Sequence, residues 1–166
     1  DARRIWFQAS GVNKDEDPYF IRYYSIGFDG SDMRDMTPSK GMHNAWLSAD
    51  KKYIVDVTST VADAPVAVLR NAETGELVMD LETADISEIV ANGWKAPEVF
   101  VAKGRDGKTD MWGIIIRPTN FDPSKKYPIL EYIYSGPGDH YVPKSFFSFN
   151  RYMSAIAELG FIVVQV

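Results

Sequence analysis

The stretch KKYPILEYIYSGPGDH, residues 125–140, decides how the second half of this chain folds. It begins with charged residues and a proline, continues as an apolar run, and ends in a glycine-rich polar loop. A continuous apolar run bounded by such turn signals is typical of a buried strand. We therefore predict a strand over residues 127–136 that is apolar on both faces.

A helix and another strand are predicted after this loop. In residues 148–160, apolar side chains recur at helical spacing before a glycine stop: Phe149, Tyr152, Met153, Ile156, Leu159 and then Gly160. Residues 161–166, FIVVQV, are typical of a buried β-branched strand. Strand, helix and strand with such apolar runs predict a parallel sheet covered on both faces. Because termini are usually exposed and polar, this apolar end also predicts a truncated chain.

Residues 1–82 predict consecutive antiparallel strands. Strands are expected over residues 3–11 and 19–30, two short strands within 45–60, and a hairpin over 65–82 that turns at 73–75. Short polar turns at this spacing are typical of a sandwich, a barrel or propeller blades.

The periodicity changes after residue 82. Ile86, Ile89 and Val90 follow a helical spacing, and Gly93 is a suitable C-terminal stop. A hairpin of strands over 98–104 and 111–118 is expected next. The chain therefore begins as an all-β protein and finishes as an α/β protein, with two incomplete domains, residues 1–82 and 97–166, joined by a linking helix within 83–96.

Composition excludes several classes of function. A formal net charge of −5 argues against nucleic-acid binding, which requires a basic face. No apolar run reaches the roughly 18 residues of a membrane span. The chain has no cysteine, and it contains no phosphate-binding glycine motif or zinc-binding histidine motif. We therefore expect no cofactor and no metal.

Ser135, Asp139 and His140 lie within one loop, but they do not make a convincing catalytic triad. A triad needs an imidazole between hydroxyl and carboxylate, whereas adjacent Asp and His side chains generally diverge. The chain also lacks the G-x-S-x-G nucleophile elbow. His43 lies far from His140 in the sequence, and the acidic segment 29–32 has the composition of a turn.

Tyr134 is the remaining candidate for chemistry. It ends the predicted strand, and loops at the carboxyl ends of parallel strands are where α/β enzymes place their sites. A tyrosine there can pack against the core, or it can present its hydroxyl to a developing oxyanion. The residues alone leave both readings open.

The segments KKYPILEYIYSGPGDHYVPKSF and LGFIVVQV resemble the start of the catalytic domain in the prolyl oligopeptidase family of serine peptidases, most closely its dipeptidyl peptidase IV branch. AWLSADKKYIV, residues 45–55, resembles the W-S-x-D-G-K-Y motif of the β-propeller in that family, with Lys51 in place of the usual glycine. The resemblance implies a β-propeller blade followed by the beginning of an α/β-hydrolase domain.

The same resemblance implies a function for the intact protein. It implies a serine exopeptidase that releases N-terminal dipeptides, often after proline, and it places the oxyanion-hole donor at Tyr134. It places the triad beyond Val166 and the amine-binding glutamates before Asp1, so that these 166 residues by themselves would be inactive.

The resemblance further implies a peptide substrate and a periplasmic or extracellular location, and it is compatible with a homodimer. Two alternatives stay open. One is another peptidase of the family, an acylaminoacyl peptidase or an oligopeptidase, and the other is a non-catalytic β-rich binding module.

Overall fold

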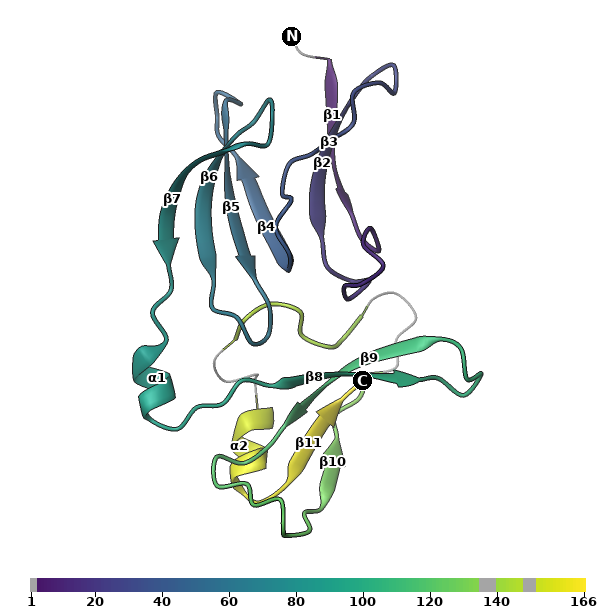
Figure 1. Cartoon of the computed structure of the whole chain (residues 1–166), viewed down its shortest axis with the longest axis vertical. Coiled ribbons are helices and arrows are strands. Elements are labelled where there is room, and N and C mark those ends of the chain that lie inside the picture. Colours follow the sequence, from purple (N-terminus) through teal and green to yellow (C-terminus); the bar gives the residue numbers. More distant parts are fainter. Residues whose placement is uncertain (1–2, 135–139, 148–151) are drawn as a thin grey trace. The chain divides into compact units, whose positions relative to one another are not determined.

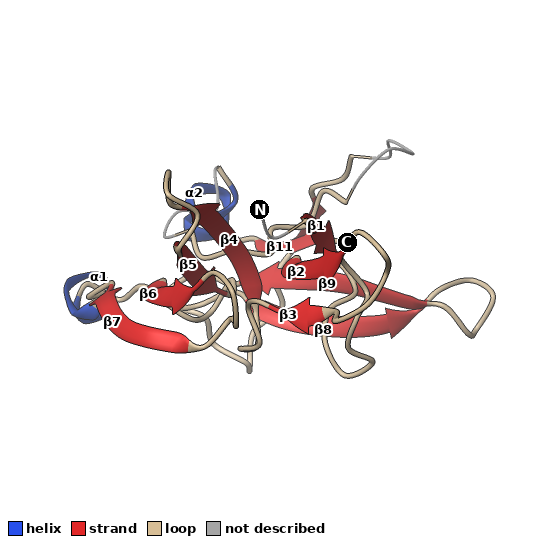
Figure 2. Cartoon of the chain, turned by 90° about the horizontal axis from the view of Figure 1, so that it is seen from above, coloured by secondary structure: helices blue, strands red, loops and turns tan. Residues whose placement is uncertain are grey.

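The computed structural model describes residues 3–134, 140–147 and 152–166, which form two compact units. Unit 1 comprises Asp1–Thr60 and Ala64–Ala84, and unit 2 comprises Val61–Asp63 and Asp85–Val166. Strands dominate both units, and the helices of the described part are short (Figure 2). None of these helices is long and apolar enough to cross a membrane.

Unit 1 consists of two antiparallel sheets. One has the order β1-β2-β3 and the other the order β4-β5-β6-β7, so that each strand of the second sheet lies beside its neighbour in sequence (Figure 1). The strands are β1 (Arg4–Ala9), β2 (Arg22–Gly27), β3 (Arg34–Asp35), β4 (Met42–Leu47), β5 (Tyr53–Ser59), β6 (Val66–Asn71) and β7 (Leu77–Thr83). The antiparallel strands predicted from the sequence are confirmed, and β3 is an additional short strand.

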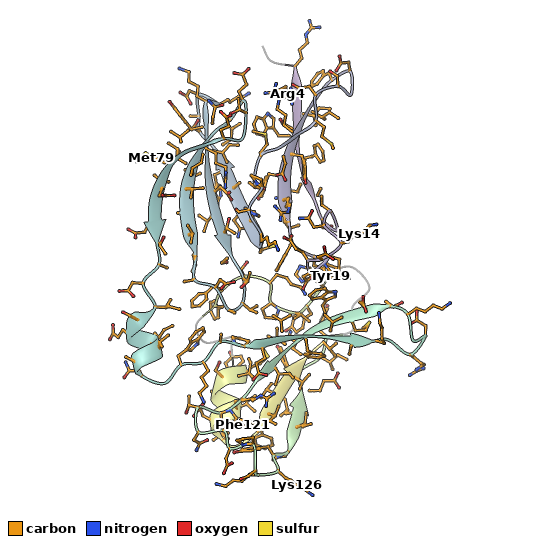
Figure 3. The ribbon with its side chains drawn as sticks, in the orientation of Figure 1. Arg4, Lys14, Tyr19, Met79, Phe121 and Lys126 are labelled. Atoms are coloured by element: carbon orange, nitrogen blue, oxygen red, sulfur yellow. The ribbon has the colours of Figure 1, made fainter. Side chains whose placement is uncertain are left out.

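A small apolar core supports unit 1. Met36, Ile54 and Ala72 are its buried members. β7 contributes little to it, because each of its residues is exposed, as the outward side chain of Met79 illustrates in Figure 3. The predicted turn at residues 73–75 is confirmed, with Gly75 at φ +79°, a backbone conformation that glycine adopts without steric cost.

Unit 2 contains one mixed sheet with the order β10-β11-β9-β8. β10 pairs with β11 in parallel, whereas β11 with β9 and β9 with β8 are antiparallel. The strands are β8 (Glu98–Lys103), β9 (Asp110–Ile116), β10 (Ile129–Glu131) and β11 (Ile162–Gln165), and helix α2 (Met153–Glu158) lies between β10 and β11 in sequence.

The core of unit 2 lies between α2 and the sheet. Met153 and Ala157 are the buried residues of α2, and they cluster with residues of β9 and β11. The complete buried cluster is Val61, Ile114, Ile116, Val142, Met153, Ala157 and Val163. Tyr152 and Leu159, which the helical spacing placed on the same apolar face, are 78% exposed.

Of the strand predicted over residues 127–136, residues 135 and 136 lie outside the described residues, and the described part is much shorter than predicted. β10 has three residues and lies at the edge of the described sheet, where it pairs with β11. Ile129 is 68% exposed. The prediction of a strand apolar on both faces was therefore wrong, because an apolar run does not reveal that its strand lies at an edge.

The linking segment forms a single short helix, α1 (Ser87–Ala91), with no buried residue. The backbone N–H of Gly93 donates to the Val90 carbonyl and that of Trp94 to the Ile89 carbonyl. With Gly93 at φ +91°, this is a glycine C-terminal stop of the kind the sequence predicted.

Candidate active-site segment after strand β10

Tyr134 lies just beyond the carboxyl end of β10. The pairing with β11 continues past Glu131, because the Tyr132 backbone N–H donates to the Val164 carbonyl at 2.8 Å. Tyr134 follows two residues later and is 66% exposed. Among the described residues, its hydroxyl has no hydrogen-bond partner. The phenol is therefore available to a ligand at the edge where parallel strands end.

Three tyrosines form a cluster at this edge, and we call Tyr132, Tyr134 and Tyr141 the tyrosine cluster. The ring centroids of Tyr134 and Tyr141 lie 5.0 Å apart, and those of Tyr132 and Tyr141 lie 5.5 Å apart. The hydroxyl groups of Tyr132 and Tyr141 are hydrogen-bonded at 2.6 Å. Tyr141 is therefore the central member and contacts both other rings.

Gln165 connects the tyrosine cluster to β11. It is 2% exposed, and its Nε2 donates to the Tyr141 carbonyl at 2.8 Å. Its Oε1 is buried without a partner in the described part of the chain. Val142, next to Tyr141, belongs to the core of unit 2. The backbone around Tyr141 is thus held on the sheet by the hydrogen bond from Gln165 and by the packing of Val142 in the core.

The other residues of the opening stretch have different positions. Ser135 and Asp139 lie outside the described residues. His140 Nδ1 lies 3.2 Å from the Val142 carbonyl oxygen, so this nitrogen can donate to the backbone.

His43 is fully buried in unit 1 and belongs to a polar network. Its Nδ1 lies 2.8 Å from Asp56 Oδ1 and 2.9 Å from Thr58 Oγ1, and its Nε2 donates to the Ser39 carbonyl at 2.7 Å. Asp56 also accepts a hydrogen bond from Arg70 Nε at 2.8 Å. Both ring nitrogens are occupied by protein groups, so the network fixes strands β4, β5 and β6 rather than holding a ligand.

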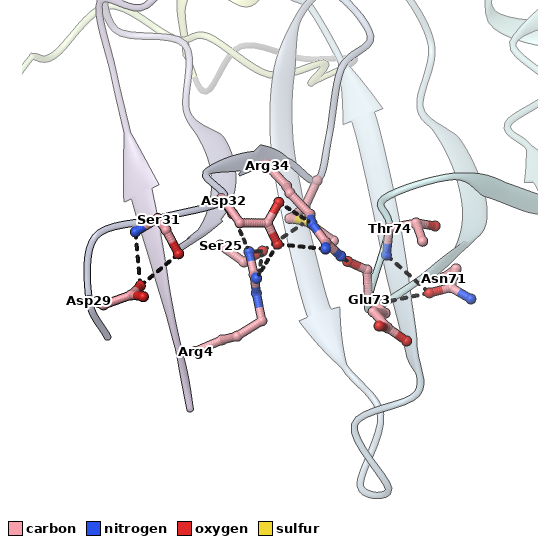
Figure 4. Close-up of polar contacts among 10 residues, drawn as sticks. Arg4, Ser25, Asp29, Ser31, Asp32, Arg34, Asn71, Glu73 and Thr74 are labelled. Atoms are coloured by element: carbon pink, nitrogen blue, oxygen red, sulfur yellow. Dashed lines mark hydrogen bonds and ion pairs between the residues drawn. The ribbon is translucent and has the colours of Figure 1, made fainter. Parts of the chain in front are cut away.

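The acidic segment 29–32 forms a turn with ion pairs (Figure 4). The Ser31 backbone N–H and hydroxyl donate to Asp29 Oδ1, and these hydrogen bonds lower the pKa of Asp29. Asp32 lies between Arg34 and Arg4, whose hydrogen bonds lower the pKa of its carboxyl. The interpretation of this segment as a turn is confirmed. The described residues contain no group of three or more His, Cys, Asp or Glu side chains that could hold a metal.

The sequence did not identify Tyr141, which contacts Tyr134, or Gln165, which contacts Tyr141. Gln165 is the one polar residue in FIVVQV, and a polar side chain in a buried strand requires a hydrogen-bond partner. That signal was available, although it did not identify the partner. Tyr141 carries no comparable signal, because an aromatic residue in a polar segment does not indicate which ring it contacts.

Comparisons with known proteins give one consistent result. No protein-family model matches the chain. The chain is 28% identical over 161 residues to dipeptidyl-aminopeptidase B of Aspergillus niger, covering 93% of this chain and 17% of the relative. It is 31% identical over 157 residues to a Penicillium rubens protein described as a dipeptidyl-aminopeptidase B, covering 91% of this chain and 17% of the relative. The chain thus spans about a sixth of the length of these relatives.

Two solved structures share the fold over 99% of this chain. Porphyromonas gingivalis dipeptidyl peptidase 4 matches with a TM-score of 0.74 and 22% identity, over 23% of that chain. A Bacteroides ovatus protein described as a dipeptidyl aminopeptidase IV matches with a TM-score of 0.76 and 25% identity, also over 23% of that chain.

The chain is thus similar to dipeptidyl peptidases over nearly its whole length. More particularly, the chain resembles a segment of dipeptidyl peptidase IV-like proteins, and the resemblance recognised in the sequence is confirmed.

Proposed function

We propose that this chain is part of a serine exopeptidase of dipeptidyl peptidase IV type, in which Tyr134 is an oxyanion-hole donor. The observation that carries the proposal is the exposed Tyr134 phenol at the carboxyl end of the parallel pair β10 and β11, in a chain that resembles dipeptidyl peptidases over nearly its whole length.

The proposal assigns a role to each part of the chain. Residues 1–82 form the end of a β-propeller, and the four-stranded sheet β4–β7 has the up-and-down order of a propeller blade. Residues 83–96 are the link. Residues 97–166 begin an α/β-hydrolase domain, which is supported by the parallel pair β10 and β11 with α2 between them.

Tyr134 supplies one part of the chemistry. When a serine attacks the scissile carbonyl, negative charge develops on its oxygen, and a neutral hydroxyl donor aimed at that oxygen stabilises the transition state more than the substrate. The second donor is the backbone N–H that follows the serine, as in other α/β-hydrolases. These 166 residues contain no G-x-S-x-G motif, so the chain by itself should be inactive.

The intact protein acts on peptides with a free N-terminus, often with proline in the second position. A direct test is to incubate the intact protein with a ten-residue peptide and, separately, with the same peptide acetylated at its N-terminus, and to identify the products by mass spectrometry. We expect dipeptides to be released only from the free peptide, and faster when its second residue is proline than when it is lysine. Cleavage of both peptides at internal bonds would favour an oligopeptidase. Release of the acetylated residue from the acetylated peptide would favour an acylaminoacyl peptidase.

A further inference from the structure

We propose that Tyr141 is a positioning residue for Tyr134, and that Gln165 holds Tyr141 in place. This inference rests on the proposed function, because it concerns how the oxyanion donor is oriented. It assigns no chemical step to either residue.

Tyr134 has few contacts among the described residues. Its side chain is 66% exposed, it is not a member of the unit 2 core, and its hydroxyl has no hydrogen bond within the described residues. The Tyr141 ring lies 5.0 Å from it at an interplanar angle of 36°. Offset or tilted aromatic pairs at this distance are attractive, so among the described residues the Tyr141 ring restricts the rotation of the Tyr134 ring.

Tyr141 is held by hydrogen bonds at both its hydroxyl and its carbonyl. Its hydroxyl bonds to that of Tyr132 at 2.6 Å, and Tyr132 packs against the unit 2 core. Its carbonyl accepts from buried Gln165 Nε2 at 2.8 Å. The Tyr141 hydroxyl is thus held by Tyr132, just after β10, and its carbonyl by Gln165 of β11, whereas the Tyr134 hydroxyl has no hydrogen bond within the described residues. The orientation of Tyr134 therefore depends on Tyr141.

The orientation of Tyr134 matters for the rate of the reaction. An oxyanion donor is effective only when it is already oriented as charge develops, and small displacements of catalytic groups reduce turnover strongly. The typical strength of an aromatic pair corresponds to about a 2- to 12-fold change in rate. Loss of the Tyr141 ring should therefore lower kcat within that range and should leave KM nearly unchanged.

The chain offers a matched control for the loss of a stacked tyrosine. The rings of Phe121 and Tyr127 lie 5.1 Å apart at 36°, and the Tyr127 hydroxyl accepts from the Asp122 backbone N–H. This pair precedes β10, in the region of Phe121 and Lys126 labelled in Figure 3. Tyr127→Leu therefore removes the same kind of contact at the opposite end of β10 from Tyr134.

The test is a double-mutant cycle in the intact protein with a chromogenic dipeptide amide as substrate. Tyr141→Leu should lower kcat by about 2- to 12-fold in the parent, should have no further effect in Tyr134→Phe, and should be rescued largely by Tyr141→Phe. Gln165→Met should also lower kcat, and Tyr127→Leu should leave kcat unchanged. The inference would be overturned if Tyr141→Leu lowered kcat equally in the parent and in Tyr134→Phe. It would also be overturned if Tyr141→Leu left the kcat of the parent unchanged while Tyr134→Phe lowered it. Neither result would contradict the proposed function.

A readout without activity separates the two claims further. With 3-fluorotyrosine at position 134 of the intact protein, the ¹⁹F resonance should move toward that of the free amino acid in Tyr141→Leu, and it should not move in Tyr127→Leu. An unmoved resonance in Tyr141→Leu would refute the positioning role. A parent-like kcat in Tyr134→Phe would refute the oxyanion assignment instead.

Discussion

The buried network around Asp56 gives the most demanding prediction for stability. Asp56 is fully buried and lies 2.8 Å from both His43 Nδ1 and Arg70 Nε, and Arg70 is only 8% exposed. Asp56→Asn keeps the shape of the side chain and removes its negative charge. The buried guanidinium of Arg70 then lacks its counter-ion.

The magnitude follows from that geometry. Breaking a buried ion pair by removing one partner costs about 3–5 kcal/mol, because it leaves an uncompensated buried charge. Total stabilities are about 5–15 kcal/mol, so the variant loses a large part of the whole. With a urea m-value of about 2 kcal/mol/M, a loss of 4 kcal/mol lowers the unfolding midpoint by about 2 M.

The assay is urea unfolding of the chain followed by far-UV circular dichroism. Asp50→Asn is the matched control. Asp50 is an exposed aspartate in the turn after β4, 3.9 Å from Lys52, and it accepts hydrogen bonds from Ser48 and Lys52, so its neutralisation should lower the midpoint far less than the loss of a buried charge. Adding Arg70→Met to Asp56→Asn should recover part of the loss, because no buried charge is then left unpaired. A midpoint of Asp56→Asn close to that of Asp50→Asn would refute this reasoning, as would a double variant less stable than Asp56→Asn.

Two further predictions concern turns. The Thr109 hydroxyl and the backbone N–H groups of Lys108 and Thr109 lower the pKa of Asp106 to about 2; its stabilising effect is therefore present above the unfolded value of about 3.9 and is lost as pH falls toward 2. Carboxyl NMR titration should show this pKa raised in Thr109→Val, and an unchanged value would contradict the assignment. Gly75→Ala should lower the thermal unfolding midpoint more than Gly30→Ala. Both glycines have positive φ, but of the two only the Cβ added at Gly75 would clash with the backbone, because it would lie 2.7 Å from the Asp35 carbonyl oxygen. Equal effects of the two substitutions would exclude that clash.

The local structure was largely predictable from the sequence. Turn residues and alternating apolar residues located the antiparallel strands of unit 1, and Gly93 located the end of α1. These features depend on contacts between residues close in sequence, such as the bonds to the Val90 and Ile89 carbonyls. They can therefore be predicted from the residues of the same segment.

The features that depend on distant contacts were not predictable. The apolar run 127–136 does not show that β10 ends after Glu131 at a sheet edge. His43 could not be assigned to the network of Asp56 and Arg70, because its partners come from neighbouring strands. Tyr134 was found through resemblance, and its contact with Tyr141 joins residues seven positions apart with no pattern in the sequence that indicates it.

The turnover of Tyr134→Phe in the intact protein tests the central claim most directly. This substitution keeps the ring and removes only the hydroxyl, which has no other hydrogen bond in the described structure, so stability should not change. On a dipeptide amide substrate, we expect kcat to fall by about 10²–10³ with little change in KM, as for the loss of one oxyanion donor. A kcat within about twofold of the parent would contradict the account and reduce Tyr134 to a packing residue.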